Sequence, residues 1–159
     1  MTEASDLEPS VAVMQDFRHI KAWQRAHALA VALHKRARNF SGLGFSRLRA
    51  QLTGSADSIG DTIMEGAGAA TAKEFARFLD MSIKSANETE GHLLKARDLD
   101  LFSPEECQAF TAEAIEIRKM TFSYRRTMLA NDKKASEKKP KEERERGRNQ
   151  QSQPEGGDD

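Results

Sequence analysis

Apolar residues recur at steps of three and four positions along four stretches of the chain, the spacing of one face of an α-helix. Almost no segment shows the alternation of apolar and polar residues typical of a β-strand. The pattern predicts helices over about residues 17–40, 46–65, 71–99 and 103–130. Four long helices with short links predict an all-α fold, an antiparallel up-and-down four-helix bundle.

Polar residues at the helix starts support these boundaries. Asp16 is a candidate N-cap for the first helix. Thr71 with Glu74, and Ser103 with Glu106, have the spacing of a capping box, in which each side chain binds the other residue's backbone N–H. These pairs predict where the third and fourth helices begin.

Two glycines interrupt the second predicted helix. Gly54 and Gly60 each cost about 1 kcal/mol relative to alanine in a helix interior. We therefore expect another helix to approach closely at these positions.

The fourth predicted helix has two apolar lines. The first forms a seam like that of a coiled coil, and it comprises Cys107, Phe110, Ala114, Ile117, Thr121, Tyr124 and Met128. The second comprises Ile115, Phe122 and Leu129, seven residues apart. One line is enough to pack a helix into its own bundle, so the second indicates either contact with another subunit or a broad core face.

The length and composition fit a single domain with charged tails. The chain has 159 residues, of which 38% are hydrophobic, and this allows one modest core. Residues 131–159 have no large apolar side chain, so we predict a disordered tail there. The predicted organisation is a flexible acidic N-terminus at 1–15, the bundle at 16–130 and the disordered charged tail at 131–159.

The compartment is predicted from what the chain lacks. Cys107 is the single cysteine, so no internal disulfide can form. The N-terminus has neither a basic region nor an apolar region of a signal peptide, and no stretch has the roughly 20 apolar residues of a membrane helix. We expect a soluble, cytoplasmic protein with no membrane partner.

The charge is unevenly distributed, although the net charge is zero. Residues 17–56 contain eight Lys and Arg residues, three histidines and no acid. Such a stretch attracts polyanions, or its bases pair with acids of neighbouring helices, and the sequence leaves both open. The candidate nucleic-acid-binding residues are Arg18, Lys21, Arg25, Arg36, Arg47 and Arg49.

The stretch DSIGDTIMEGAG, residues 57–68, combines carboxylates with glycines and is a candidate phosphate-binding loop beside acidic residues. No predicted strand precedes it, and the third glycine of G-x-G-x-x-G and the Lys of a P-loop are missing. We interpret Gly66 as the end of the second helix. Asp57, Asp61 and Glu65 are then the electrostatic counterpart of the basic first helix.

The remaining candidate chemistry is sparse. The Glu-x-x-His pairs of di-iron bundles are absent, because Glu88 and Glu90 stand four and two residues before His92. Cys107 lies on the apolar seam, where a buried thiol is usual. We predict no catalytic residue, metal site or cofactor; an enzyme with a carboxylate site is a distant alternative.

Several motifs carry a family resemblance. They are W-Q-x-A in the first helix, S-I-x-x-x-I-x-E-G in the second and K-E-F-x-R-F-L in the third. The chain resembles the four helix bundle proteins, also called 23S rRNA intervening sequence proteins, which are similar to the accessory proteins of diversity-generating retroelements. The resemblance covers about residues 17–130. The motif residues are Trp23, Gln51, Ser58, Ile59, Glu65, Gly66, Glu74, Phe75, Phe78, Leu79 and Glu88.

The resemblance implies a small bacterial bundle that assembles into a ring, typically a homopentamer, without known catalytic activity. The retroelement relatives bind nucleic acid and a reverse transcriptase through a basic surface. This chain has Thr53 and Gly54 where the family commonly has arginines, Thr62 where it has asparagine, and His34 at an aromatic position. Arg47 and Arg49, one turn earlier, are the candidates to replace the missing arginines.

Together these observations predict a non-enzymatic, ring-forming bundle that binds nucleic acid, RNA in preference to DNA, as an accessory factor. Its expected partners are copies of itself, RNA or DNA, and a reverse transcriptase or other protein. The alternative is a protein–protein interaction scaffold without nucleic-acid binding. Basic residues already neutralised by Asp57, Asp61 and Glu65 would favour that alternative.

Overall fold

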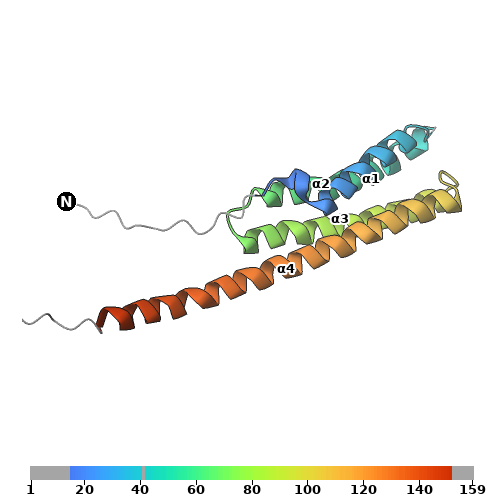
Figure 1. Cartoon of the computed structure of the whole chain (residues 1–159). Helices are drawn as coiled ribbons and strands as arrows, with labels where there is room; N and C mark the ends of the chain where they lie inside the picture. Colours follow the sequence, from blue (N-terminus) through green and yellow to red (C-terminus); the bar gives the residue numbers. More distant parts are fainter. Residues whose placement is uncertain (1–14, 41, 152–159) are drawn as a thin grey trace, which may run out of the picture.

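The computed structural model describes residues 15–40 and 42–151, and its helices lie side by side along their length (Figure 1). Each helix packs against the next one in the chain, and α1 also packs against α4. The predicted all-α fold with four helices is confirmed. The elements are η1 (Phe17–His19), α1 (Lys21–Ala37), η2 (Leu43–Phe45), α2 (Ser46–Ala67), α3 (Ala72–Asp98) and α4 (Pro104–Gln151).

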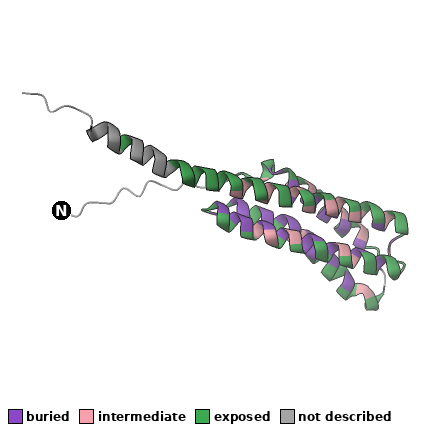
Figure 2. Cartoon of the chain, turned by 90° about the horizontal axis from the view of Figure 1, so that it is seen from below, coloured by how far each residue is buried: buried purple, intermediate pink, exposed green. Residues whose placement is uncertain are grey.

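The core consists of the apolar faces that the periodicity indicated. Leu33 of α1, Ile59 of α2, Leu93 of α3 and Ile117 of α4 are completely buried. A second cluster around Phe75 fills the end where α2 meets α3. Buried residues line the inner sides of the helices in Figure 2.

The capping box of Ser103 and Glu106 is complete, whereas that of Thr71 and Glu74 is half formed, because Oε2 of Glu74 accepts from the N–H of Ala70 at 3.2 Å and not from that of Thr71. The backbone N–H of Ser103 donates to Oε2 of Glu106 at 2.9 Å, and the N–H of Glu106 donates to Oγ of Ser103 at 3.1 Å. The N–H of Glu74 donates to Oγ1 of Thr71 at 3.1 Å. The predicted starts of the third and fourth helices are therefore confirmed.

The first predicted helix is divided in two. Asp16 caps the 3-10 turn η1 by accepting from the N–H of Arg18 at 3.0 Å. Ile20 then has extended backbone angles, and α1 begins at Lys21. The side chain of Gln24 donates to the carbonyl oxygen of Arg18 at 2.6 Å, which satisfies a backbone group that the interruption frees.

The second helix does not end at Gly66, so that prediction was wrong. α2 continues to Ala67, and Gly68 is its C-cap. A Cβ atom on Gly66 would lie 2.5 Å from Cδ2 of Phe75 and 2.8 Å from Cβ of Phe78. Glycine is therefore needed here because α3 packs closely against α2, and not as a helix stop.

The close approach that we predicted at Gly54 and Gly60 is absent. A Cβ on Gly60 would make ordinary contact with Ala26, at 3.7 Å, and one on Gly54 would have nothing within 4 Å.

Hydroxyl groups line the contact between α2 and α3. The hydroxyls of Ser58 and Ser85 are 2.9 Å apart, and Ser82 donates to the carbonyl of Ile59 at 2.9 Å. Small side chains bring the helices together, and their buried polar atoms are satisfied within the contact.

Helix α4 extends well beyond the other three (Figures 1 and 2). The tail predicted to be disordered is helical from 131 to 151, and the side chains of 131–138 are exposed. Ala, Lys, Glu and Arg are good helix formers, and extending an existing helix avoids the cost of nucleation. Residues 1–14 and 152–159, parts of the two predicted tails, lie outside the described residues.

Among the helices described, none combines the length and the apolar character needed to cross a membrane.

Candidate nucleic-acid interface

The six predicted nucleic-acid-binding residues do not form one cluster. Arg18 lies in η1 and Lys21 is the first residue of α1, whereas Arg36 lies in the last turn of α1, about 22 Å from Lys21 at 1.5 Å per residue. Arg47 and Arg49 lie in the first turn of α2. The six residues therefore have different surroundings.

Arg25 is ion-paired with α4. Its Nε and Nη2 donate to the two carboxylate oxygens of Glu113 at 2.7 and 2.6 Å. This hydrogen bonding lowers the pKa of Glu113 and raises the pKa of Arg25. Arg25 thus connects α1 to α4 and is poorly available to a phosphate.

Arg36, in the last turn of α1, forms a similar ion pair with Glu106, in the first turn of α4. Its Nε and Nη2 donate to Glu106 at 2.5 and 3.1 Å, and Nη2 also donates to the carbonyl of Leu101 at 3.0 Å. The guanidinium lies 4.9 Å from the ring centre of Phe102. Two hydrogen bonds to the carboxylate lower the pKa of Glu106 to about 2: the larger effect comes from the Arg36 side chain, and the next from the backbone N–H of Ser103.

These partners differ from the ones that we predicted. Asp57 binds His34, with Nε2 of the imidazole 2.8 Å from Oδ2. The carboxylates of Asp61 and Glu65 have no hydrogen-bond or ion-pair partner among the described residues. The acids of residues 57–68 are therefore not the counterpart of Arg25 and Arg36, because α4 supplies the neutralising charges.

Unpaired bases gather where α1 ends and α2 begins. Arg38 and Arg49, with His34 and Thr53, line a hollow of about 300 Å³ between these helices. Within the described part of the chain, neither guanidinium group has a hydrogen-bond or ion-pair partner, and both residues are exposed. We call this region the basic tip; it comprises Lys35, Arg38, Arg47 and Arg49.

Arg38 was missed from the sequence. It belongs to the same acid-free stretch as the six chosen residues, but it follows the last residue of α1 as its C-cap. A selection by angle around one helix excludes such a residue, although the turn to α2 brings it beside Arg49.

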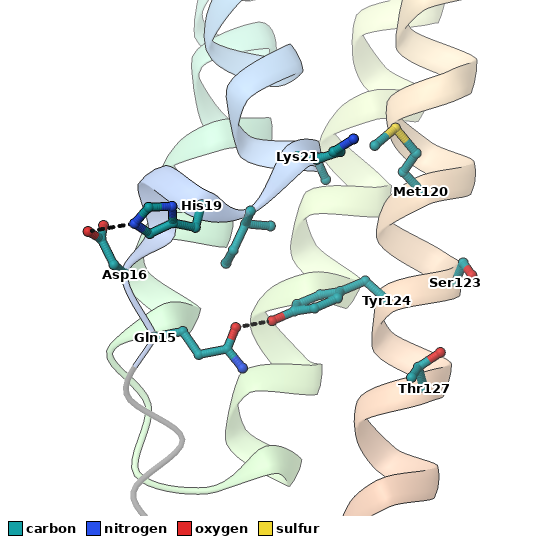
Figure 3. Close-up of a pocket in the computed structure, with 10 residues that line it drawn as sticks. Gln15, Asp16, His19, Lys21, Met120, Ser123, Tyr124 and Thr127 are labelled. Carbon is teal, nitrogen blue, oxygen red and sulfur yellow. Dashed lines mark hydrogen bonds and ion pairs between the residues drawn. The ribbon is translucent and has the colours of Figure 1, made fainter.

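A larger hollow, of about 670 Å³, lies between the start of α1 and α4 (Figure 3). The hydroxyl of Tyr124 donates to Oε1 of Gln15, and burial raises the pKa of this tyrosine. Asp16 pairs with Arg18 at 3.2 Å, whereas Lys21 has no such partner among the residues described. We call this hollow the α1–α4 groove. It is lined by Gln15, Asp16, His19, Ile20, Lys21, Ala22, Met120, Ser123, Tyr124 and Thr127.

No group of three or more His, Cys, Asp or Glu side chains within residues 15–40 and 42–151 is arranged to hold a metal ion.

The sequence comparison identifies the family. The model of the 23S rRNA-intervening sequence proteins matches residues 18–123. The chain belongs to this family. The match begins within η1, covers the first three α-helices and ends within α4 before the helical extension. A comparison with curated proteins finds no significant match.

A solved structure shares the family's fold. It is a crystal structure of a protein with unknown function from the S23 ribosomal protein family of Bacteroides thetaiotaomicron. The two chains are 24% identical, with a TM-score of 0.58, and the match covers 65% of this chain and 96% of the other. At this identity the likeness supports the architecture alone.

Most of the family motif residues have structural roles in the bundle. Ile59, Phe75 and Leu79 are completely buried, and Phe78 is half-buried. Trp23 packs edge-on against Phe17, with ring centres 4.7 Å apart. The structural roles of Ser58, Gly66 and Glu74 are those described above. Gln51, Glu65 and Glu88 are exposed.

Proposed function

We propose that this protein is a non-catalytic bundle that binds nucleic acid, RNA in preference to DNA, through its basic tip. The observation that carries the proposal is the hollow between α1 and α2, which Arg38 and Arg49 line from two different helices. Neither guanidinium has a partner within the described chain. Two free guanidinium groups beside one hollow match the charge and geometry of phosphate oxygens.

The charges around the tip favour a polyanion. Residues 17–56 contain no acid, and Asp57, the next acid in the chain, binds His34. Contacts to phosphates alone would make binding tolerant of sequence and steeply dependent on salt. The family is named for intervening sequences of 23S rRNA, which supports RNA as the ligand. An accessory role beside a reverse transcriptase or another protein is part of the same proposal.

A second candidate function is a protein-interaction scaffold without nucleic acid. The pairing of Arg25 and Arg36 with α4 supports it, because it removes two bases from the predicted interface. Assembly into a ring of copies, a homopentamer by resemblance, is compatible with both functions. RNA binding distinguishes the two.

The test compares RNA affinity of the full chain with that of the double variant R38E/R49E over a range of salt concentrations. A single-stranded RNA of about 20 nucleotides is a suitable probe. We expect the double variant to bind at least tenfold more weakly at low salt. The slope of log affinity against log salt should also fall by about 1.4, since each lost single-strand phosphate contact removes about 0.7.

A matched control reverses the same amount of charge elsewhere. R77E/K84E changes two exposed bases of α3 that have no partner within the described chain. We expect it to retain most of the wild-type affinity. The proposal is wrong if wild type does not bind at low salt, or if the two double variants lose affinity equally.

A further inference from the structure

A histidine and an aspartate lie beside the hollow of the basic tip. His34 lines this hollow together with Arg38 and Arg49, and it stands one turn before Arg38 on the same face of α1. Asp57 follows Arg49 by about two turns of α2 and binds His34 across the two helices. The proposed function uses the guanidinium groups alone, so it leaves this pair without a role.

The geometry of the pair determines where His34 takes up a proton. Nε2 of the imidazole lies 2.9 and 2.8 Å from the two carboxylate oxygens of Asp57. An ionised carboxylate only accepts hydrogen bonds, so Nε2 carries a hydrogen and donates it. Nδ1 has no hydrogen-bond partner within the described chain. In the neutral ring Nδ1 is therefore a bare acceptor, and the proton that charges the ring adds there.

Adding this proton changes the charge beside the hollow. With a neutral imidazole, the carboxylate of Asp57 is an uncompensated negative charge close to the place of a phosphate, which it repels. With an imidazolium, the carboxylate is balanced and Nδ1 becomes a donor, the kind of group that binds phosphate oxygens. Protonation of His34 thus favours an anion in the hollow in two ways.

The other charged groups around His34 keep their charge near neutral pH. On its own helix they are Lys35 and Arg38, and on α2 they are Arg49, Asp57 and Asp61. The charged groups of η1 lie at the opposite end of α1. Helix α4 also packs against α1, but its carboxylates Glu106 and Glu113 bind Arg36 and Arg25. Histidine is the only side chain that ordinarily changes its charge between pH 5 and 8, so His34 is the titrating group of this set.

We propose that His34 is a third phosphate-binding residue of the hollow, positioned by Asp57, and that RNA binding at the basic tip takes up a proton at Nδ1. A backbone phosphate of the RNA then contacts two guanidinium groups and one imidazolium. Because the RNA binds the protonated form more tightly, the two equilibria are linked, and the affinity rises as the pH falls from 8 toward 5.5. This inference rests on the proposed function and adds its regulation by pH.

The test measures the affinity of the full chain for a single-stranded oligouridine of about 20 nucleotides at pH 5.5 and at pH 8, in the same low salt. Uracil does not change its charge between these pH values. We expect wild type to bind roughly fivefold more tightly at pH 5.5, the equivalent of about one net hydrogen bond. In His34→Gln the amide nitrogen can still donate to Asp57 but does not titrate, so this variant should bind equally at both pH values.

His19→Gln is the matched control. His19 is also an exposed histidine beside an aspartate, with Nε2 3.7 Å from Oδ2 of Asp16. It lies in η1, at the other end of α1 from the hollow. H19Q makes the same chemical change away from the basic tip and should keep the wild-type dependence on pH.

Asp57→Asn tests the role of the carboxylate. It removes the negative charge and keeps an oxygen that accepts from Nε2 of His34. At pH 8 it should bind the oligouridine roughly threefold more tightly than wild type, the effect of one partly exposed charge. D61N, which neutralises an exposed and unpaired carboxylate one turn further along α2, should have a smaller effect. A pair with a merely structural role gives the opposite sign, because losing the link between α1 and α2 loosens the hollow and weakens binding.

Two results would overturn the inference: a response to pH that is equal in wild type and H34Q, or a D57N variant that binds no more tightly than D61N at pH 8. H34N replaces H34Q if circular dichroism shows that H34Q is unfolded. Both results leave the proposed function intact, because R38E/R49E decides that function separately. Absence of RNA binding by wild type at both pH values would instead refute the proposed function and this inference together.

Discussion

Single residues at helix contacts determine how closely α2 and α3 pack. Gly66 sits against Phe75, which is completely buried and whose ring therefore cannot move aside. The need for glycine here is invisible in the sequence, where a glycine near the end of an apolar pattern predicts a stop. The capping residues Ser103 and Glu106, by contrast, were predictable because their hydrogen bonds span only three positions.

Substituting Gly66 by alanine should destabilise the bundle. The added Cβ gains up to about 1 kcal/mol of helix propensity, but it would lie 2.5 Å from Phe75, and overpacking costs about 1–3 kcal/mol. We expect a net loss of about 1–2 kcal/mol in the free energy of unfolding, measured by urea titration. Gly54→Ala is the control, because it meets no atom within 4 Å and should stabilise by about 0.5–1 kcal/mol. Equal effects of both substitutions would contradict this account.

At the scale of elements, the apolar periodicity predicted all four helices. It did not predict the interruption of the first helix at Ile20 or the continuation of α4 to Gln151. The break at Ile20 depends on the Asp16 cap and on Gln24 reaching back to Arg18. Apolar spacing does not report such local bonds. The extension of α4 shows the converse. The side chains of residues 131–138 are exposed, and yet the chain continues a helix that packing has already nucleated.

Removing residues 131–159 should therefore cost helix content but little stability. The side chains of 131–138 are exposed, and surface changes of this kind usually alter the free energy of unfolding by no more than about 0.5 kcal/mol. We expect far-UV circular dichroism to lose the helical signal of residues 131–151, with the urea midpoint nearly unchanged. A fall in stability of more than about 1 kcal/mol would mean that the extension packs against the bundle.

Across the whole molecule, two ion pairs connect α1 to α4 in addition to the apolar contacts of the core. The α1–α4 groove separates the two helices at one end, while Arg25–Glu113 and Arg36–Glu106 join them further along. These pairs link residues 88 and 70 positions apart, so no reading of local spacing could assign them. The sequence shows that residues 17–56 contain no acid. It does not show which of their bases remain unpaired, because the pairing acids lie so far along the chain.

Because of these two ion pairs, the free energy of unfolding should decrease as the pH falls through the acidic range. Glu106 has a pKa of about 2 in the folded chain against 4.5 ordinarily, and the pKa of Glu113 is also lowered. Because both folded values are depressed, their stabilisation is complete above about pH 4.5 and is lost as the pH falls toward 2. The side chain of Glu106 is 37% exposed, so solvent screening limits each pair to on the order of 1 kcal/mol.

The double variant E106Q/E113Q should accordingly be less stable than wild type by on the order of 1–2 kcal/mol at pH 6, with the difference shrinking at pH 3 and vanishing near pH 2. Urea unfolding at each pH measures it. E65Q/E105Q is the matched control: the side chains of Glu65 and Glu105 are exposed and have no partner within the described residues, so its effect should be small at every pH. A difference for E106Q/E113Q that did not shrink between pH 6 and pH 2 would contradict this account, because the stabilisation would then not depend on the charge of the two carboxylates.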